Sequence, residues 1–447
     1  MSNSNRIFHW ATTVALAGFL FGFDTVVISG ANLPIKTLWN TSPWFHGTFI
    51  MSMALWGTVI GALFANVPTD RMGRKKTLFW IGIFYAISAL GSAMAPDPYT
   101  FSFFRFLGGL GVGASSVAAP TYISEVAPSS MRGRLVARYQ FMIVFGILVA
   151  FFSNYLLAGI GGEMDWRLML GVEAVPAIIY CMMVPSIPNS PRWLVLHKND
   201  ELTAKNILIS AGIDQVDRAI SNIKESVKVA SSDKLWSKKY KFPLLLAFFI
   251  ALFNQLSGIN FILYYAPEIL EKAGLATKES LFSSISIGFV NLIFTLFGMI
   301  LIDRAGRKLL MYIGSVGYIV SLGMVSFLFL TNSTPEILLV FLLMFIGAHA
   351  VGQGAVIWVF ISEIFPNAMR ARGQSFGAGV HWVMAAAITL LTPVFLDSQS
   401  GIFRDNPWPI FAFFCICTIL QLIFVALFMP ETKGKNLEEI ENELVRE

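Results

Sequence analysis

Twelve long apolar runs divide the sequence, separated by short polar loops and one longer charged segment. A helix needs about 20 apolar residues to cross the hydrocarbon core of a membrane, and the runs have about this length. A helix also pairs every backbone N–H and C=O within its own segment, as a membrane interior demands. The runs therefore predict an all-α membrane protein with twelve spanning helices. They lie near residues 10–30, 46–67, 77–96, 101–123, 136–159, 166–187, 243–267, 280–302, 309–330, 335–361, 373–396 and 407–429.

The composition excludes an ordinary soluble domain. The 447 residues are 55% hydrophobic and only 13% charged, whereas soluble domains carry about 25% charged residues. A membrane barrel would instead need short strands of alternating polarity, which the sequence does not contain. The histidines, cysteines and acidic residues have no metal-ligand spacing, and no catalytic set can be argued from them. We expect no enzyme activity, no cofactor, no metal and no nucleic-acid partner.

The distribution of Lys and Arg predicts the orientation of the chain. Basic residues concentrate in the loops at 68–76, 131–138, 190–241, 303–308 and 369–372. The alternate loops hold few, and cytoplasmic loops attract positive residues. This asymmetry also accounts for the net charge of +5. We expect a multi-pass protein of the plasma membrane, here a bacterial inner membrane, with both termini in the cytoplasm.

Two charged motifs each occur twice. "YISEVAPSSMRGR" at 122–134 returns as "FISEIFPNAMRAR" at 360–372, and "DRMGRKK" at 70–76 returns as "DRAGRK" at 303–308. The spacings match six spans plus a loop, so the repeats predict two pseudo-symmetric bundles, an architecture typical of transporters. The expected units are an N-terminal bundle, a linker of amphipathic helices on the cytoplasmic side, a C-terminal bundle and a cytoplasmic tail. Their ranges are 1–189, 190–241, 242–430 and 431–447.

The repeated motifs place acids and bases together at the cytoplasmic ends of the helices. We expect them to pair across the two bundles as a latch in the state that is closed to the inside. Surface pairs contribute about 0–1 kcal/mol each, so only a network would bias the equilibrium. The alternative is that the bases only set the topology. The expected latch consists of Asp70, Arg71, Arg74, Glu125, Arg132, Asp303, Arg304, Arg307, Glu363 and Arg370.

One acid lies inside the first span. Asp24 is surrounded by Phe and Val residues, and a carboxylate at that depth costs a few kcal/mol unless it is paired or protonated. Arg105, in the fourth span, lies at a matching depth when both are counted at 1.5 Å per residue. The second repeat has Ile262 and Leu343 at the corresponding positions. We predict that protonation of Asp24 frees Arg105 and couples proton entry to transport; the alternative is a static ion pair.

The motifs together resemble the sugar porter family of the major facilitator superfamily over nearly the whole chain. The resemblance rests on "GFDTVVISG" at 22–30, "PNSPRWL" at 188–194, "NQLSGINFILYY" at 254–265, "PETKG" at 430–434 and the two repeated motifs. It implies the twelve-helix fold, alternating access and a monosaccharide substrate. The proton-coupled symporters of this family resemble the chain in having Asp at the position of Asp24.

The resemblance also implies the sugar contacts. Amides offer both donors and acceptors to a ring of hydroxyls, and an indole offers a flat apolar face with one N–H. The alternative for each amide is a hydrogen bond between helices. Gly258 predicts a break that brings Gln255 to the same face as its neighbours. The implied contacts are Phe21, Gln140, Asn254, Gln255, Asn260, Tyr264, Asn291, Gly354, Trp358 and His381.

Some positions depart from the family pattern. Ala355 replaces the Pro of the "GPxxW" motif, and His381 stands where Gln or Asn is usual. His381 can bind sugar or be a satisfied interior residue. Ile147 is apolar as in the glucose carriers, whereas the bacterial xylose symporter has Gln. We therefore predict a monomeric proton-coupled monosaccharide symporter for a hexose such as glucose, with a facilitative uniporter or a membrane sugar sensor as alternatives.

Overall fold

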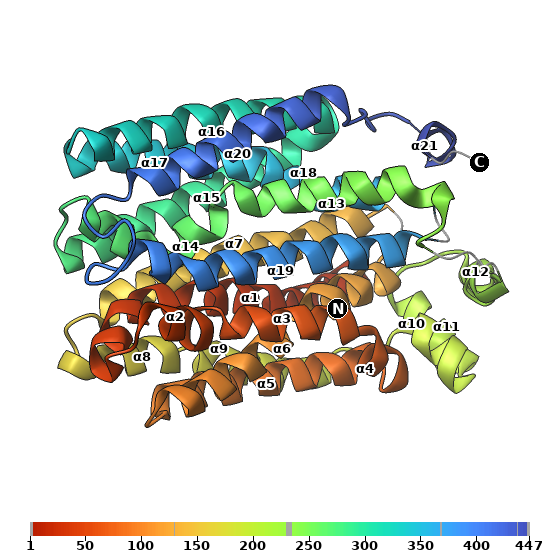
Figure 1. Cartoon of the computed structure of the whole chain (residues 1–447). Coiled ribbons are helices and arrows are strands. Elements are labelled where there is room, and N and C mark those ends of the chain that lie inside the picture. The colour runs from red at the N-terminus through yellow and green to blue at the C-terminus, as the bar shows by residue number, and fades with distance from the viewer. Residues whose placement is uncertain (1–2, 129, 229–234, 367–368, 436, 445–447) are drawn as a thin grey trace.

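The computed structural model describes residues 3–128, 130–228, 235–366, 369–435 and 437–444, and within these ranges the regular elements are all helices. Eleven helical segments are long and apolar enough to span a membrane, and a bent pair supplies the twelfth. The predicted twelve-helix membrane fold is confirmed. Two bundles lie side by side, and the linker helices gather at one end of them (Figure 1). We call this the linker end and the opposite end the far end.

The N-terminal bundle contains the first six spans. The second span bends by 42° between Pro43–Met51 and Met53–Phe64, and the sixth is interrupted between α8 and α9. The elements are α1 (Asn3–Trp39), α2 (Pro43–Phe45), η1 (His46–Met51), α3 (Met53–Phe64), α4 (Asn66–Arg71), α5 (Arg74–Met94), α6 (Pro98–Val126), α7 (Arg132–Leu157), η2 (Gly162–Met164), α8 (Asp165–Gly171), α9 (Ala174–Met183) and η3 (Val184–Ser186).

The C-terminal bundle contains the other six spans. Its first and fourth spans are each divided in two, at Gly258 and Gly352. The elements are η5 (Lys238–Tyr240), α13 (Lys241–Leu256), α14 (Ile259–Lys272), α15 (Thr277–Ala305), α16 (Arg307–Leu330), α17 (Pro335–Val351), α18 (Gln353–Glu363), α19 (Arg370–Leu396), α20 (Trp408–Leu427) and, in the tail, α21 (Leu437–Leu444).

The linker carries short amphipathic helices, as its sequence pattern predicts. These are α10 (Pro191–Trp193), η4 (Leu194–Lys198), α11 (Glu201–Ser210) and α12 (Val216–Lys228). Their apolar faces form a small separate core around Trp193, Leu208 and Ile220. Residues 229–234 of the expected linker and 436 and 445–447 of the expected tail lie outside the described residues.

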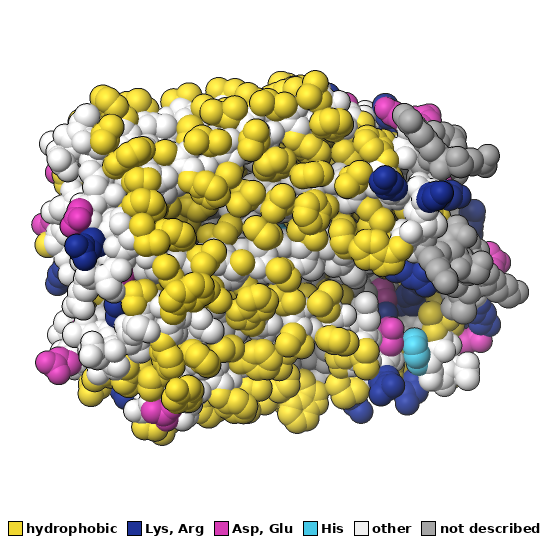
Figure 2. All heavy atoms as spheres, viewed as in Figure 1, with side chains coloured by type: hydrophobic (Ala, Val, Ile, Leu, Met, Phe, Trp, Pro, Cys, Tyr) yellow, Lys and Arg dark blue, Asp and Glu magenta, His cyan; other side chains and the backbone are white. Residues whose placement is uncertain are grey.

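The surface separates a lipid-facing zone from two polar ends. Large side chains such as Phe64, Phe282 and Leu427 are exposed on the spanning helices. Figure 2 shows hydrophobic side chains covering the middle of the molecule, with charged side chains at its two ends. This distribution is expected of helices whose outer faces contact acyl chains rather than water.

Glycines bring helix backbones into contact within the N-terminal bundle. A Cβ atom on Gly109 of α6 would lie 1.9 Å from the Ala54 carbonyl oxygen of α3. A Cβ atom on Gly22 of α1 would lie 1.8 Å from the Ile143 carbonyl oxygen of α7. Small residues at such crossings permit the close van der Waals packing that holds membrane helices together.

The break at Gly258 is confirmed. Gly258 has a φ of +87°, a left-handed conformation that favours glycine, and it separates α13 from α14. A second irregularity follows within α14, where Tyr265 has non-helical angles (φ −118°, ψ 17°) just before Pro267. The span is thereby divided into segments, and both irregularities pack within the C-terminal bundle, Gly258 against Phe414 of α20 and Tyr265 against Thr389 of α19.

Candidate functional site

The predicted pair of Asp24 and Arg105 is formed in the interior of the N-terminal bundle. Arg105 Nη1 donates to Asp24 Oδ1 at 2.5 Å, and Nη2 donates to the Asp24 backbone carbonyl at 3.2 Å. Asp24 is 1% exposed and Arg105 is 2% exposed. The pair joins α1 to α6. Because the charges are buried and bonded to each other, each is the main compensation for burial of the other.

A second carboxyl group belongs to this site and was not foreseen from the sequence. Glu173 lies at the interruption between α8 and α9, and its side chain is close enough to Asp24 for the two carboxyl groups to interact. It is 1% exposed, and its Oε1 has no hydrogen-bond partner among the described residues. An acid inside an apolar run was the signal that marked Asp24, and the same signal was present at Glu173. The site therefore contains two carboxyl groups and one guanidinium.

A glycine makes room for the carboxyl groups. A Cβ atom on Gly108 of α6 would lie 2.3 Å from Ser88 Oγ and 3.5 Å from Asp24 Oδ1. Any larger side chain at this position would displace the α5 hydroxyl or crowd Asp24. The glycine-rich stretch of α6 thus serves helix packing and also leaves space beside the buried charges.

Four of the implied sugar contacts meet in an amide cluster in the C-terminal bundle. Asn260 Nδ2 donates to Gln255 Oε1 at 2.9 Å, and Gln255 Nε2 donates to Asn254 Oδ1 at 3.1 Å. The same Gln255 nitrogen lies 3.2 Å from both ring nitrogens of His381. The break at Gly258 allows this meeting, because it changes the direction of the chain between Gln255 and Asn260.

The cluster has one more amide, which the sequence motifs did not indicate. Asn254 Nδ2 donates to Gln353 Oε1 at 3.4 Å, and Gln353 Nε2 is buried without a partner among the described residues. Gln353 lies beside Gly354 at the start of α18. It extends the cluster behind Asn254, on a helix that also carries Trp358.

Aromatic rings surround His381. Its ring lies 4.9 Å from the Trp358 ring and 4.8 Å from the Trp382 ring, measured between centroids. Trp382 in turn lies 5.6 Å from Phe21 of α1, so this group crosses the seam between the bundles. Trp358 is 36% exposed, which leaves its ring accessible. Flat apolar faces beside amide groups match the chemistry of a sugar ring.

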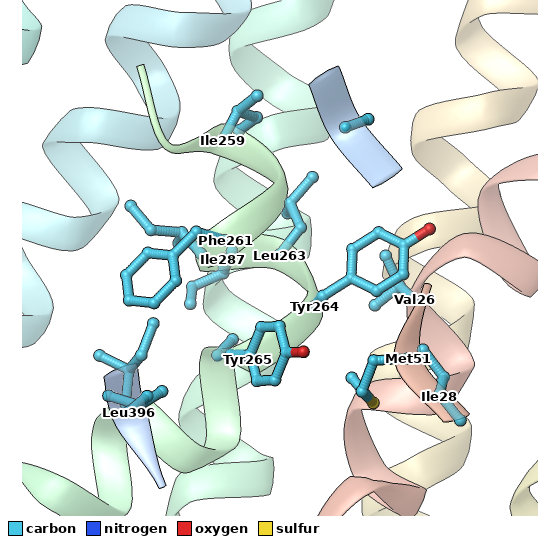
Figure 3. Close-up of a cluster of buried hydrophobic side chains, with 14 of the residues drawn as sticks. Val26, Ile28, Met51, Ile259, Phe261, Leu263, Tyr264, Tyr265, Ile287 and Leu396 are labelled. Atoms are coloured by element: carbon cyan, nitrogen blue, oxygen red, sulfur yellow. The ribbon is translucent and has the colours of Figure 1, made fainter. Parts of the chain in front are cut away.

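The remaining implied contacts are more dispersed. Tyr264 extends from α14 toward Val26 of α1 (Figure 3), close to Thr25 and next to the charged site. Asn291 of α15 is buried and accepts from Thr295 Oγ1 at 3.4 Å. Gln140 of α7 and Gly354 of α18 are half-buried. Amides therefore face the seam from the C-terminal bundle, whereas the buried charges lie in the N-terminal bundle.

The latch residues form two equivalent networks at the linker end. In the N-terminal bundle, Arg74 lies 2.9 Å from Glu125 and 3.0 Å from Asp70, and Ser190 Oγ donates to Glu125 at 2.5 Å. In the C-terminal bundle, Arg307 lies 2.7 Å from Glu363 and 3.6 Å from Asp303. Thr432 Oγ1 takes the place of the serine and donates to Glu363 at 2.6 Å.

These ion pairs lie within each bundle, whereas the repeats predicted pairs between bundles. Helical i,i+4 spacing joins Asp70 to Arg74, and each glutamate ends the helix that packs beside its arginine. Arg71, Arg132 and Arg304 are exposed. Arg370 is half-buried, and its Nε and one terminal nitrogen have no hydrogen-bond partner among the described residues.

The second network is completed by Glu431 of the "PETKG" motif. Its carboxylate accepts from the backbone N–H groups of Arg307 and Lys308 at 3.0 Å each, and so caps the start of α16. Burial would raise the pKa of Glu431, but the hydrogen bonds that it accepts from the backbone N–H groups of Lys433, Arg307 and Lys308 together outweigh burial and lower the pKa. The motif thus fixes the chain after the last span against the repeated "DRAGRK" loop.

Comparisons with known proteins agree with this architecture. The family described as "Sugar (and other) transporter" matches residues 10–444. The arabinose-proton symporter of Bacillus subtilis is 35% identical, over 95% of this chain and 92% of that protein. The glucose transporter GlcP of Staphylococcus epidermidis is 35% identical, over 96% and 95%. A partially occluded, inward-open structure of the xylose transporter XylE from E. coli superposes with a TM-score of 0.85 at 29% identity, covering 97% of this chain and 100% of that one.

These matches extend across both bundles and the linker. The motifs that carried the resemblance, the twelve spans and the two equivalent networks at the linker end all fall within the matched residues. The chain is a multi-pass membrane protein and belongs to the sugar transporter family of the major facilitator superfamily.

Proposed function

We propose that the chain is a proton-coupled monosaccharide symporter that works by alternating access. The observation that carries the proposal is the buried site of Asp24, Arg105 and Glu173 in one bundle, facing an amide cluster in the other. The linker end, where the basic loops gather, is assigned to the cytoplasm together with both termini. The protein acts as a monomer in the plasma membrane, with a sugar and a proton as its two cargoes.

Charge balance at the buried site supports proton coupling. Two carboxyl groups and one guanidinium are neutral together when one of the carboxyl groups carries a proton. A site this dry disfavours any net charge, so losing that proton must be compensated by movement or by water. Because Asp24 is the carboxyl group that accepts from Arg105, Glu173 is the carboxyl group better placed to hold the proton.

The amide cluster supports the sugar assignment. In the present conformation Asn254, Gln255 and Asn260 bond mainly to one another and to His381. A sugar can replace these bonds because each amide both donates and accepts. Trp358 offers an accessible apolar face for the ring. Tyr264 touches both regions, through Thr25 near the charges and through α14 near the amides, and so links the two cargo sites.

The substrate is proposed to be a hexose such as glucose. Relatives of the chain are named for arabinose, xylose and glucose, so the names do not separate pentoses from hexoses. Ile147, which is buried in α7, favours the hexose because it matches the glucose carriers in the sequence pattern. His381 replaces the usual amide beside Gln255 and keeps one acceptor and one donor when neutral.

The charged residues at the linker end act as a latch that changes partners between conformations. Glu125 and Glu363 are each held within their own bundle. Support for exchange of partners comes from Arg370, because two of its guanidinium nitrogens, Nε and Nη2, are buried without a partner among the described residues. In the state closed to the cytoplasm, Arg370 pairs with a carboxylate of the opposite bundle.

Transport in proteoliposomes tests this function. Labelled D-glucose should accumulate against its gradient when the outside is acidified, and a protonophore should abolish the accumulation. Competition by hexoses and pentoses then identifies the sugar. Equilibration of sugar that is insensitive to the protonophore would instead establish the facilitative uniporter. Specific binding without transmembrane flux would favour the sugar sensor.

A further inference from the structure

A chain of hydrogen bonds joins the two bundles at the far end. Asn32 Nδ2 of α1 donates to Glu268 Oε2 of α14 at 2.7 Å. Asn32 Oδ1 lies 2.7 Å from His46 Nε2 of η1, and His46 Nδ1 lies 2.8 Å from Thr41 Oγ1. Asn32 is 2% exposed and Glu268 is 7% exposed. This series of hydrogen bonds is separate from the Asp24 site and from the amide cluster.

Donors and acceptors can be assigned consistently along this series of hydrogen bonds. Because the Asn32 amide nitrogen donates to the carboxylate, its oxygen must accept from His46 Nε2–H. When His46 is neutral, its Nδ1 accepts from the Thr41 hydroxyl. Every polar atom of Asn32 that faces Glu268 or His46 is therefore satisfied. A buried network that is fully satisfied fixes one arrangement of the helices it joins.

A second contact joins the bundles close by. Lys36 of α1 forms an ion pair with Asp397, which ends α19. Asp397 Oδ1 also accepts from the backbone N–H groups of Gln399 and Ser400, at 3.0 Å and 2.7 Å. The charged groups that act on Glu268 are Lys36 from α1 and Lys272 and Glu271 from its own helix. Both contacts between the bundles, Asn32 with Glu268 and Lys36 with Asp397, therefore start from the last turns of α1.

Glu268 lies on a segment that can change direction. It follows the non-helical Tyr265 and Pro267, and the α13–α14 break at Gly258 lies further along the same span. Helix irregularities of this kind are where backbone direction is adjusted. The hydrogen bond from Asn32 to Glu268 therefore holds the end of an interrupted helix rather than the middle of a straight one.

We propose that Asn32 and Glu268 are positioning residues of the transport cycle: their hydrogen bond holds the far ends of the bundles together and sets the population closed on that side. The proposal rests on the proposed rocking of the bundles, but it does not depend on which sugar or ion is carried. Neither residue touches the Asp24 pair or the amide cluster through a hydrogen bond described above. Their effect is on the conformational equilibrium, because a bond present in only one state favours that state.

Amide hydrogen exchange of the purified full chain in nanodiscs tests the proposal without sugar or a proton gradient. Asn32→Leu removes the bond and replaces the amide by an apolar side chain of similar size. A charge-assisted hydrogen bond typically shifts an equilibrium about tenfold. Exchange should therefore rise about tenfold in peptides covering 28–39 and 262–272, and fall in peptides covering 303–312 at the linker end. Glu279→Gln, an exposed acid in the first turn of α15 at the same end, is the matched control and should change neither.

The swapped pair Asn32→Asp with Glu268→Gln provides the rescue. The amide introduced on α14 can donate to the carboxylate introduced on α1, and that carboxylate still accepts from His46. Exchange should therefore return toward that of the parent chain. If Asn32→Leu does not yield folded protein, Glu268→Gln alone weakens the bond and should shift both regions several-fold in the same sense. The proposal is overturned if amide exchange in Asn32→Leu rises at both ends or stays unchanged at the far end. It is also overturned if the swapped pair shows the same exchange as Asn32→Leu. Failure of proton-coupled uptake would not produce any of these results.

Discussion

Replacing Asp24 by Asn removes one carboxylate from the buried charged site and leaves the amide cluster intact. Arg105 loses its 2.5 Å bond to the carboxylate but keeps the 3.2 Å bond to the Asp24 backbone carbonyl. Glu173, which contacts residue 24, becomes the only carboxyl group there to balance the guanidinium. The site then balances its charge without a proton. We therefore expect Asp24→Asn to bind and exchange sugar but not to couple its movement to protons.

The size of the effect follows from the charge count. One titrating proton per cycle moves one elementary charge, which is equivalent to about 2.3 kcal/mol per 100 mV of membrane potential. Since about 1.36 kcal/mol corresponds to a factor of ten, a coupled cycle at 100 mV accumulates sugar about 50-fold. Asp24→Asn should reduce this ratio to about 1, while sugar counterflow between equal concentrations remains within a few-fold of the parent rate.

The assay compares accumulation and counterflow in the same proteoliposomes, with a potassium diffusion potential as the driving force. Asp405→Asn removes an exposed acid at the far end and serves as the matched control. Accumulation of about 50-fold in Asp24→Asn would refute the coupling role. A parallel loss of counterflow and accumulation would show that the substitution damages the site. Asp24→Asn with Glu173→Gln leaves Arg105 without a carboxylate, and breaking a buried pair costs about 3–5 kcal/mol, so this double variant should not yield stable protein.

Three further predictions concern packing, pH and the sugar site. Gly109→Ala should lower the unfolding temperature by forcing α3 from α6, at a cost of about 1–3 kcal/mol, whereas Gly133→Ala, where a Cβ meets nothing within 4 Å, should not. Because the pKa of Glu431 is lowered in the folded state, its stabilisation is present above about pH 4.3 and is lost as the pH falls through the folded-state pKa. The unfolding temperatures of the parent and Glu431→Gln should therefore differ at pH 7 and converge as the pH falls through the folded-state pKa, and a difference that persists throughout acid titration would contradict the assignment. His381→Gln should retain transport with an altered order of sugar preference, whereas His381→Leu should raise the KM for sugar at least tenfold, because Gln255 loses a buried partner; equal KM values for both would remove His381 from the sugar site.

The helices were predictable because their signal is spread over many residues. Each apolar run of about 20 residues corresponds to a span, and Gly258 marked a break because glycine adopts its φ of +87° without strain. The bend of the second span was not predictable. The segment before the bend packs tightly against the opposite bundle, since a Cβ on Gly47 of η1 would lie 2.0 Å from the Leu390 carbonyl oxygen. A contact of that kind is a property of the assembled seam and not of the local sequence.

The buried acids show that the average hydropathy of an apolar run can hide a single charged residue within it. Asp24 is conspicuous because it is a lone charge among Phe and Val residues. Glu173 and Glu268 lie in or beside apolar runs of the same kind, and the average hydropathy of those runs hides them. The repeats likewise identified equivalent residues such as Glu125 and Glu363, but equivalence does not say whether a pair forms within a bundle or between bundles. That distinction depends on which conformation the chain occupies.

The absence of a counterpart to Asp24 and Arg105 in the second repeat has a consequence for how the two halves divide their work. Ile262 is fully buried at the matching position, so no ionic group answers Asp24 there. On the proposed mechanism, voltage and acidity exert their force on one half alone, and the other half selects the nutrient. Two halves that share one repeated architecture have in this way taken different tasks, energy coupling in the N-terminal bundle and sugar selection in the C-terminal bundle.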